Sequence, residues 1–583
     1  MITKHLDLWT GAVSQKSTRG RGSNSKVELT GVKKLRGLIL ELAVRGKLIE
    51  QDSGDDPASC LIAEVRNQRY ALVGERQLGP QTKLSEVINT ETPYQLPKGW
   101  EWCRLGDLAE IIRGVTYKKH QVLEQAAENH IALLRANNIQ ETITDEAAIY
   151  VPLELVNDRQ LITKGDILIA MSSGSANLVG KAAQTNCDLQ ATFGAFCGAV
   201  RPLKQKLSSY LGLYTTTPLY RDQAQAAGKG IGINNLNKKA LDNMLVPVPP
   251  EKEQHRIVQK VDELMALCDR LARQSGDQLE AHETLVDTLL GTLNRSEKTT
   301  ELADNWARLA THFDTLFTTE QSIDKLKQTI LQLAVMGRLV EQGAGDTPPS
   351  ALLEKISSER LELAESGKIK LSSRHAALTS QEPAPFAIRT SWHWTHLESL
   401  FAVVTDGDHQ APPKSEQGIP FLVIGNLNAG EINFTSCKYV SEDYFDNLDW
   451  SRKPTKGDLL YTVTGSYGIP IKVDTDRAFC VQRHVAILKA TDSTPRDFIK
   501  LLLASEYGLS YADNVATGIA QKTVPLSGLR KMPVPLPPVQ EQHRIVQKVD
   551  ELMALCDQLK ERLNQAGETR CQLAEAVVDE ALN

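Results

Sequence analysis

The chain has 583 residues, of which 41% are hydrophobic and 38 are glycine, as in a folded protein of several domains. It contains no apolar run as long as the roughly 18 residues that a membrane-spanning helix needs. Met1–Trp9 also lacks the pattern of a secretory signal, so we expect a cytoplasmic protein without a membrane partner. Nine cysteines without a Cys-x-x-Cys pair argue against a disulfide framework and a zinc ribbon.

The formal net charge of −6 gives no sign of a generally basic nucleic-acid binder. Residues 97–250 carry 16 basic and 14 acidic side chains, and residues 389–538 carry 15 and 16. A nucleic acid would therefore have to be bound by local basic surface within a nearly neutral domain.

In chain order, residues 1–95 are predicted to hold an N-terminal tail and a helical region, with a helix near Leu29–Arg45. Thr10–Val27 in the tail is basic and rich in Gly and Ser. This composition favours disorder, with folding against DNA or a partner as the alternative.

Residues 96–250 and 389–538 are predicted to be two globular α+β domains. They contain short apolar runs bounded by Gly, Asn, Asp and Pro, as in strands joined by turns, at Ile131–Leu134, Ile167–Met171, Phe421–Ile424 and Leu459–Val463. Residues 251–388 form a central helical region between the two domains, and residues 539–583 form a C-terminal helical region.

Both of these helical regions begin with the apolar spacing of a coiled-coil seam, in steps of four and three residues. The positions are Ile257, Val261, Leu264, Cys268 and Leu271, and Ile545, Val549, Leu552, Cys556 and Leu559. Nothing breaks the first pattern before Asn294, which predicts a helix of about 43 residues and about 65 Å. A second helical stretch is expected over roughly Glu301–Met336. We interpret these helices as structural spacers and docking rods.

The chain is a tandem duplication of one unit of about 290 residues, as expected of repeat architectures. Glu253–Asp269 recurs without change at Glu541–Asp557, an offset of 288 residues. Three further pairs have nearly the same offset, namely Leu35–Gln51 with Leu326–Gln342, Trp100-Glu101-Trp102 with Trp392-His393-Trp394, and Lys164-Gly165-Asp166 with Lys456-Gly457-Asp458. The predicted fold is α+β, with two globular domains joined and separated by long antiparallel coiled-coil helices in a pseudo-twofold arrangement.

The duplicated helices are nearly alike, whereas the globular segments differ. Polar positions that we expect to be exposed are identical in both copies, among them the candidate partner-binding residues Gln254, Arg256, Lys260, Gln542, Arg544 and Lys548. Core packing alone tolerates substitution and would not keep exposed positions identical. Two copies of one partner would explain the identity, and so would a recent duplication.

With this plan, the chain resembles the specificity subunits of type I restriction-modification systems over nearly its whole length. The family has two target recognition domains separated by conserved helical regions, with a Pro-Pro segment before Glu-Gln and an apolar heptad. Pro249-Pro250-Glu251-Lys252-Glu253-Gln254 and Pro537-Pro538-Val539-Gln540-Glu541-Gln542 match that segment. Glu251 departs from the apolar residue usual after the prolines. The Trp-x-Trp and Lys-Gly-Asp pairs match as well.

The resemblance implies a subunit that recognises DNA and is not catalytic by itself. It implies binding to double-stranded DNA with a bipartite site, to two modification (methyltransferase) subunits and to restriction (motor and nuclease) subunits. No cofactor is expected in this chain, because S-adenosylmethionine, ATP and Mg²⁺ would belong to the partner subunits. Each recognition domain would recognise a few base pairs, and the helices would set the gap between them.

A search of the sequence for an active site gives no candidate. Val179-Gly180-Lys181-Ala182 lacks the spacing and the Ser/Thr of a phosphate-binding P-loop. His393 and His396 have a spacing that could hold a metal ion, but the matching positions in the first copy are Glu101 and Arg104, so we expect no metal site.

Candidate DNA-binding residues are loop side chains of the types that contact bases and phosphates. In the first domain they are Tyr117, Lys118, Lys119, Arg135, Asn137, Asn138, Ser172, Ser173, Ser175, Lys229, Asn234 and Asn235. In the second they are His409, Lys414, Asn426, Thr464, Ser466, Tyr467, Arg483, His484, Gln521 and Lys522. The sequence thus predicts a DNA-specificity subunit, with a self-contained methyltransferase or nuclease, or a coiled-coil scaffold without a DNA role, as alternatives.

Overall fold

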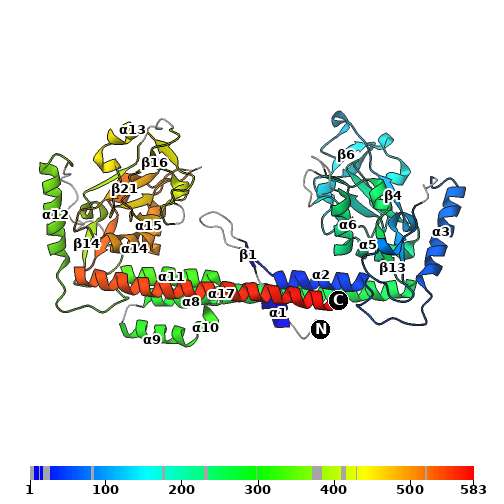
Figure 1. Cartoon of the computed structure of the whole chain (residues 1–583), viewed down its shortest axis with the longest axis horizontal. Helices are drawn as coiled ribbons and strands as arrows, with labels where there is room; N and C mark the ends of the chain where they lie inside the picture. The colour runs from blue at the N-terminus through cyan, green and yellow to red at the C-terminus, as the bar shows by residue number, and fades with distance from the viewer. Residues whose placement is uncertain are drawn as a thin grey trace. The chain divides into compact units, whose positions relative to one another are not determined.

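Figure 1 shows a computed structural model of the chain. It describes residues 6–11, 14–16, 26–79, 84–173, 178–228, 234–296, 299–370, 384–408, 415–427, 430–518 and 521–582. The chain forms two compact units, the first of Met1–Gln15, Val27–Gly276 and Gly567–Asn583 and the second of Lys16–Lys26 and Asp277–Ala566. The end of the last helix belongs to the first unit.

The globular part of the first unit contains two main sheets. One has the strand order β4-β11-β7-β9 and the other β10-β5-β6, built from β4 (Ala109–Arg113), β5 (His130–Leu134), β6 (Ile149–Pro152), β7 (Ile167–Ala170), β9 (Ala182–Gln184), β10 (Ala191–Phe193) and β11 (Cys197–Pro202). Short pairs join β3 (Glu101–Arg104) to β13 (Leu245–Val248) and β8 (Ser172–Ser173) to β12 (Asn234–Asn235). The helices are α4 (Leu105–Leu108), α5 (Ser208–Tyr214), α6 (Pro218–Gly228) and α7 (Lys238–Asp242).

The globular part of the second unit has the same topology, although the two sequences resemble each other only faintly. Its sheets have the orders β15-β21-β18-β19 and β17-β16-β20, from β15 (Val403–Asp406), β16 (Ile419–Leu422), β17 (Lys438–Val440), β18 (Leu459–Thr462), β19 (Pro470–Lys472), β20 (Cys480–Val481) and β21 (Val485–Lys489). Strand β14 (His393–His396) pairs with β22 (Pro533–Leu536). The helices are α13 (Glu442–Asp446), α14 (Arg496–Ala504), α15 (Glu506–Val515) and α16 (Leu526–Arg530).

The apolar runs expected to be strands are buried strands. Every residue of β7 and of β18 is buried, which agrees with continuous apolar runs at the centre of a sheet rather than an alternating pattern. The duplication therefore covers the globular parts, and their cores keep the same strand order with different residues.

In the first unit, three helices pack together along their apolar faces. They are α2 (Thr30–Val44), the beginning of α8 (Glu251–Arg295) and the end of α17 (Val539–Leu582). Ile257, Val261 and Cys268 of the predicted seam are buried there. The N-terminal α1 (Leu6–Gly11) and α3 (Ala58–Gly74) complete the helices of this unit, and β1 (Ser14–Lys16) pairs with β2 (Lys26–Glu28) within the tail expected to be disordered.

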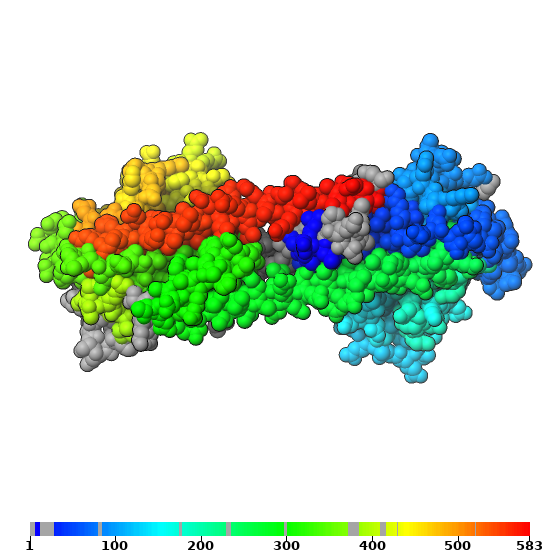
Figure 2. Space-filling model, turned by 90° about the horizontal axis from the view of Figure 1, so that it is seen from below, coloured from blue at the N-terminus to red at the C-terminus, as the bar shows by residue number. Residues whose placement is uncertain are grey.

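The second unit repeats this packing with α11 (Glu320–Val335), the beginning of α17 and the end of α8. Figure 2 shows α17 (orange to red) lying along green helices of this unit, with its outer side open to solvent. Helices α14 and α15 pack on α11 (Figure 1), and α12 (Pro349–Glu365) contacts the start of the globular part.

The helical stretch expected over residues 301–336 consists of three helices. They are α9 (Thr299–Thr311), α10 (Phe313–Leu316) and α11. The chain breaks before α11 because the Thr319 side chain accepts a hydrogen bond from the Ser322 backbone N–H, the arrangement that starts a new helix. Among the helices in the described ranges, none is long and apolar enough to cross a membrane.

Candidate nucleic-acid interface

The Lys-Gly-Asp motif anchors the central strand of each globular domain. The buried carboxylate of Asp166 accepts two hydrogen bonds from Arg201, at 2.8 and 2.7 Å, and one from the Thr163 backbone N–H at 2.8 Å. Gly165 between them has a φ of +93°, which favours glycine. Both carboxylate oxygens of Asp166 accept hydrogen bonds, so the residue is a structural anchor without a free oxygen for acid–base chemistry.

The second domain makes the same anchor with a different cation. Lys489 donates to Asp458 at 2.6 Å, and both side chains are buried. The Thr455 backbone N–H donates to the same carboxylate at 2.7 Å. Among the residues that the structure describes, no three potential metal ligands gather in one place, and His393 is exposed whereas His396 is buried.

A second repeated cluster connects each globular domain to its long helix, and we call it the domain joint. In the first unit the joint consists of Gly46, Asp55, Trp100, Glu253 and Arg256. The indole N–H of Trp100 donates to Glu253 at 3.0 Å, and the Arg256 guanidinium donates to Asp55 at 2.6 Å. Burial raises the pKa of Glu253, partly offset by Trp100 and Arg256.

The second joint consists of the equivalent Gly337, Asp346, Trp392, Glu541 and Arg544. Arg544 donates to both Asp346 oxygens, at 3.1 and 2.6 Å, and holds the pKa of that carboxyl below its ordinary value. Burial raises the pKa of Glu541, partly offset by the neighbouring Trp392 and Gln342. Gly337 has a φ of +68° and lies against the Trp392 ring, where a Cβ would be 2.8 Å from a ring carbon, so only glycine fits.

The joint corrects the expectation that the identical polar residues all lie on an exposed face. Gln254 and Gln542 are buried, and their side-chain amides donate to the carbonyls of Pro249 and Pro537 at 2.9 and 2.8 Å. These two glutamines hold the helix starts and are not available to a partner. Their internal hydrogen bonds explain why the same residue stands at this position in both copies. The sequence alone does not distinguish a residue kept for such a bond from one kept for a partner.

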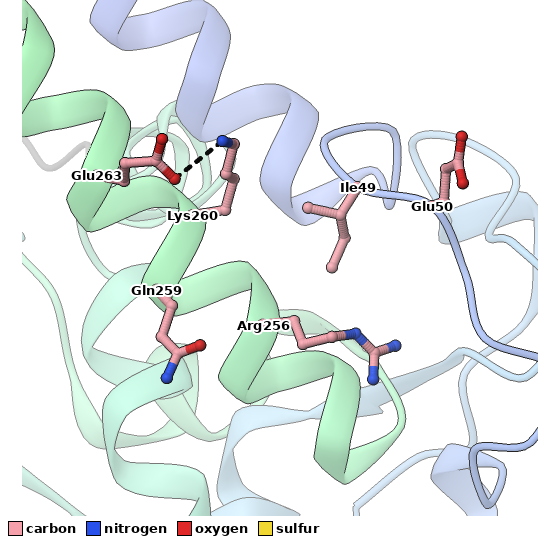
Figure 3. Close-up of a pocket in the computed structure, with 6 residues that line it drawn as sticks. All are labelled: Ile49, Glu50, Arg256, Gln259, Lys260 and Glu263. Carbon is pink, nitrogen blue, oxygen red and sulfur yellow. Dashed lines mark hydrogen bonds and ion pairs between the residues drawn. The ribbon is translucent and has the colours of Figure 1, made fainter.

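Part of the identical face is nevertheless at the surface. Gln259 and Glu263 are exposed and Lys260 is half-buried in a 2.9 Å ion pair with Glu263. With Ile49, Glu50 and Arg256 these residues line an open hollow of about 260 Å³ (Figure 3). The equivalent residues Gln547, Lys548 and Glu551 repeat this pattern, including a 3.0 Å ion pair between Lys548 and Glu551.

In the first globular domain, predicted DNA-binding residues from distant segments meet around the turn Gly194–Phe196. Ser172 and Ser173 pair with Asn235 and Asn234 through β8 and β12. The Phe196 carbonyl accepts the Ser172 backbone N–H at 3.1 Å. The Tyr117 ring lies beside Gly194, and Lys118 and Lys119, which follow it, are exposed.

In the second domain the corresponding segments meet in the same way. The His484 carbonyl accepts the backbone N–H of Val463, which precedes Thr464, at 2.9 Å, and Gly465 donates to the Lys522 carbonyl at 3.2 Å. Ser466, Arg483, Gln521 and Lys522 are exposed around this point.

Four candidates are buried, so the prediction that they contact DNA is wrong. Asn138 is buried, accepts the Arg135 backbone N–H at 2.9 Å and donates to the Glu146 carbonyl at 2.8 Å. Asn426 makes the equivalent bonds to Val423 and Asn433, both at 3.0 Å. Tyr467 donates to Asp513 at 2.6 Å, and Thr464 accepts from Thr523 at 3.3 Å. Each polar group is used inside its own domain.

The remaining candidates are divided between the surface and undescribed parts of the chain. Asn137 is exposed, and half-buried Arg135 donates to the Ala147 carbonyl at 3.1 Å. Ser175, Lys229, His409 and Lys414 lie outside the described residues, and Asn234 is described only by its backbone. Sequence reasoning missed Phe196, whose side chain is 69% exposed. Phe196 has no polar side-chain group and lies between two strands, so its residue type gave no signal of a contact with DNA.

The chain is similar to known proteins along its whole length. The model of the type I restriction modification DNA specificity domain matches residues 97–281 and 407–568. The specificity subunits of the type I restriction enzymes EcoEI and EcoAI of Escherichia coli are each 33% identical over all of this chain and 99% of their own. The crystal structure of the HsdS subunit from Thermoanaerobacter tengcongensis covers 85% of this chain and 99% of its own at 18% identity, with a TM-score of 0.39.

These matches decide between the alternatives left open by the sequence. Full-length relatives are specificity subunits, so the chain is neither a self-contained methyltransferase or nuclease nor a scaffold without a DNA role. Two copies of the DNA specificity domain, each with a polar surface around an equivalent turn, are the parts expected for recognising a target sequence. The chain belongs to the family of type I restriction enzyme specificity subunits, the non-catalytic DNA-recognition components of these systems.

Proposed function

We propose that this specificity subunit binds a two-part DNA target, with each globular domain recognising one part. The observation that carries this proposal is the repeated domain joint, which connects two domains of equal topology but different surface residues to equivalent helices. Two domains that are attached to their helices in the same way but have different surface residues suit two different half-sites on one duplex. The half-buried and exposed residues around the two turns supply donors, acceptors and positive charge for bases and phosphates.

The long helices act as the spacer between the half-sites, as an antiparallel coiled coil with pseudo-twofold symmetry. Two corresponding sets of contacts support this. Arg36 of α2 pairs with Asp269 of α8, and its equivalent Lys327 of α11 pairs with Asp557 of α17. At 1.5 Å per residue, the 45 residues of α8 extend about 68 Å, which limits the separation to about 20 base pairs.

The partners are double-stranded DNA, two modification subunits and restriction subunits, in the cytoplasm. S-adenosylmethionine, ATP and Mg²⁺ act in those subunits. The modification subunits dock on the surface parts of the identical face, which we call the docking face: Ile49, Glu50, Gln259, Lys260 and Glu263 in the first unit and Val340, Glu341, Gln547, Lys548 and Glu551 in the second. Most of these residues recur without change in the chain, and two equal surfaces suit two copies of one partner.

The test is to sequence the modified bases in DNA from cells that contain the complete system. We expect methylation within an interrupted, two-part motif. Replacing residues 390–533 with the globular domain of another family member should change one part of this motif and leave the other part and the gap unchanged. A continuous motif, or a change in both parts after the replacement, would refute the proposal.

A further inference from the structure

The turns Gly194–Phe196 and Gln482–His484 occupy equivalent places in the two globular domains. Gly194 N–H donates to the Leu134 carbonyl at 2.9 Å, and Gln482 N–H donates to the Leu422 carbonyl at 3.0 Å. Each turn closes with a second bond, from Cys197 to Gly194 at 2.8 Å and from Val485 to Gln482 at 3.0 Å. The two turns therefore have the same backbone hydrogen bonds but carry different side chains.

In the first domain, the Phe196 ring is the only large group that the turn offers. Gly194 and Ala195 have no functional side chain. The Gly194 carbonyl is used within the turn, and the Phe196 carbonyl accepts from Met171 and Ser172 at 2.8 and 3.1 Å. The backbone is thus occupied while the ring is 69% exposed. Such a turn can make an apolar contact but has little left for hydrogen bonding.

In the second domain, the same turn offers a cation. Arg483 is exposed, and its Nε donates to Nε2 of His484 at 3.3 Å. Burial and the charge of Arg483 lower the pKa of His484, which favours the neutral imidazole that can accept this bond. The bond uses Nε and leaves both terminal amino groups of the guanidinium for a ligand. Two parallel donors of this kind match guanine O6 and N7.

We infer that these two turns are base-recognition elements with opposite chemistry, Phe196 contacting the methyl group of a thymine in one half-site and Arg483 donating to a guanine in the other. This inference rests on the proposed function and names the base chemistry of each half. Basic residues flank both turns, Lys118 and Lys119 in the first domain and Lys522 in the second. They suit the phosphates beside the contacted bases and favour a DNA duplex over a protein partner as the ligand.

The first experiment compares matched variants in the complete modification complex by sequencing methylated sites. Phe196→Ala should relax the motif at one A·T position in one half, and Arg483→Ala should relax one G·C position in the other half. Leu153→Ala and Lys438→Ala are the controls. Leu153 is 51% exposed and follows β6, and exposed Lys438 lies in β17. Both strands lie at the sheet edge opposite the strand that leads into the turn, so the control motifs should be unchanged.

The second experiment tests the contacted atoms by binding of the complex to duplexes of the motif found for the unmodified protein. Replacing the thymine by deoxyuridine removes only the methyl group and should weaken binding about fourfold, the value of one buried methyl-sized group. Phe196→Ala should be insensitive to this replacement. Removal of guanine N7 with 7-deazaguanine removes one of the two acceptors and should weaken binding by about 2- to 13-fold, about half the free energy of a bidentate base contact, and Arg483→Ala should abolish the difference.

The outcomes separate this inference from the function on which it rests. If the unmodified complex yields no two-part motif, the proposed function fails. If it yields one but Phe196→Ala and Arg483→Ala behave like their controls, or relax both halves equally, the inference is wrong and the function stands. Thermal unfolding shows that each variant is folded, and Phe196→Leu, which keeps an apolar contact, should retain the preference for thymine.

Discussion

Trp100 donates its indole N–H to Glu253 across 3.0 Å, joining the residue before the first strand of a globular domain to the first turn of its long helix. The glutamate is buried and its pKa is raised by that burial. Together with the Arg256–Asp55 pair, this bond gives the identical helix residues a structural role. These polar contacts add to the hydrophobic core that the domain shares with the start of its helix.

Replacing Glu253 by glutamine should reduce the pH dependence of stability. A carboxyl with a raised pKa in the folded state favours folding most below its ordinary pKa of 4.5. That contribution is lost as the pH rises through the folded-state pKa. Glu253→Gln keeps an acceptor for Trp100, so it should be at least as stable as the unmodified protein at pH 7. Urea unfolding between pH 4.5 and 7 measures this, with exposed Glu263→Gln as the control that keeps the original dependence.

Removing Arg256 should loosen the first joint. Asp55 is nearly buried and its partner is half-exposed, so Arg256→Ala should lower the free energy of unfolding by about 1–2 kcal/mol. Arg544→Ala should have the same effect in the second joint. Lys260→Ala, one turn further along the helix, removes only a surface ion pair and should change stability by less than about 0.5 kcal/mol. If Arg256→Ala and Lys260→Ala changed urea unfolding equally, the stabilising role of Arg256 in the joint would be contradicted.

The docking face predicts a change in stoichiometry. Gln259→Ala with Lys260→Ala should leave a complex with one modification subunit, and adding Gln547→Ala with Lys548→Ala should leave none. The side chains are at the surface, so the variants should fold normally. Native mass spectrometry of the assembled complex counts the subunits. Two bound subunits in the quadruple variant would show that these surface residues are not the docking site and recur through recent duplication.

The ion pair between Asp166, just before β7, and Arg201 should tolerate lysine in place of the arginine. Arg201→Lys should cost about 1–2 kcal/mol, because the bidentate geometry is lost while the charge is kept, and the second domain already uses Lys489 for Asp458. Arg201→Met leaves the Asp166 carboxylate buried without a cation and should cost about 3–5 kcal/mol. Chemical unfolding of the two variants ranks them, and a lysine variant no better than the methionine variant would contradict this account.

Lengthening both long helices should widen the gap in the DNA target. Inserting seven residues after Gly276 and after Ala566 keeps the heptad phase and adds about 10 Å, or about three base pairs. Both sites are where the two compact units divide. Sequencing of methylated sites should show both half-sites unchanged and a wider gap. An unchanged gap would mean that something other than the helices sets the spacing.

The helices and the central strands could be predicted because their signals are local. Ile257, Val261 and Cys268 are buried as their heptad positions predict, and Ile167–Ala170 is a strand fully buried in a sheet. The break before α11 was missed because it depends on one capping side chain, Thr319.

The candidate site was predicted less well because it depends on contacts between distant segments. Ser172 and Asn235 pair although 63 residues separate them, and no local pattern predicts such a register. Asn138 and Asn426 have the residue type of base-contacting groups, but each amide is used to close its own loop. Residue type shows what a side chain can bind, whereas burial decides whether it is available.

The first compact unit includes Gly567–Asn583, the final residues of the chain. During synthesis on the ribosome, the apolar face of α2 is covered only after this last segment of α17 has been made. Ala574 in that segment is fully buried. A polypeptide cut short by a premature stop codon would leave Leu35, Leu38 and their neighbours partly exposed. Exposed apolar side chains of this kind are bound by chaperones and attacked by proteases. A chain that stops before Gly567 therefore cannot complete the hydrophobic core of the first unit.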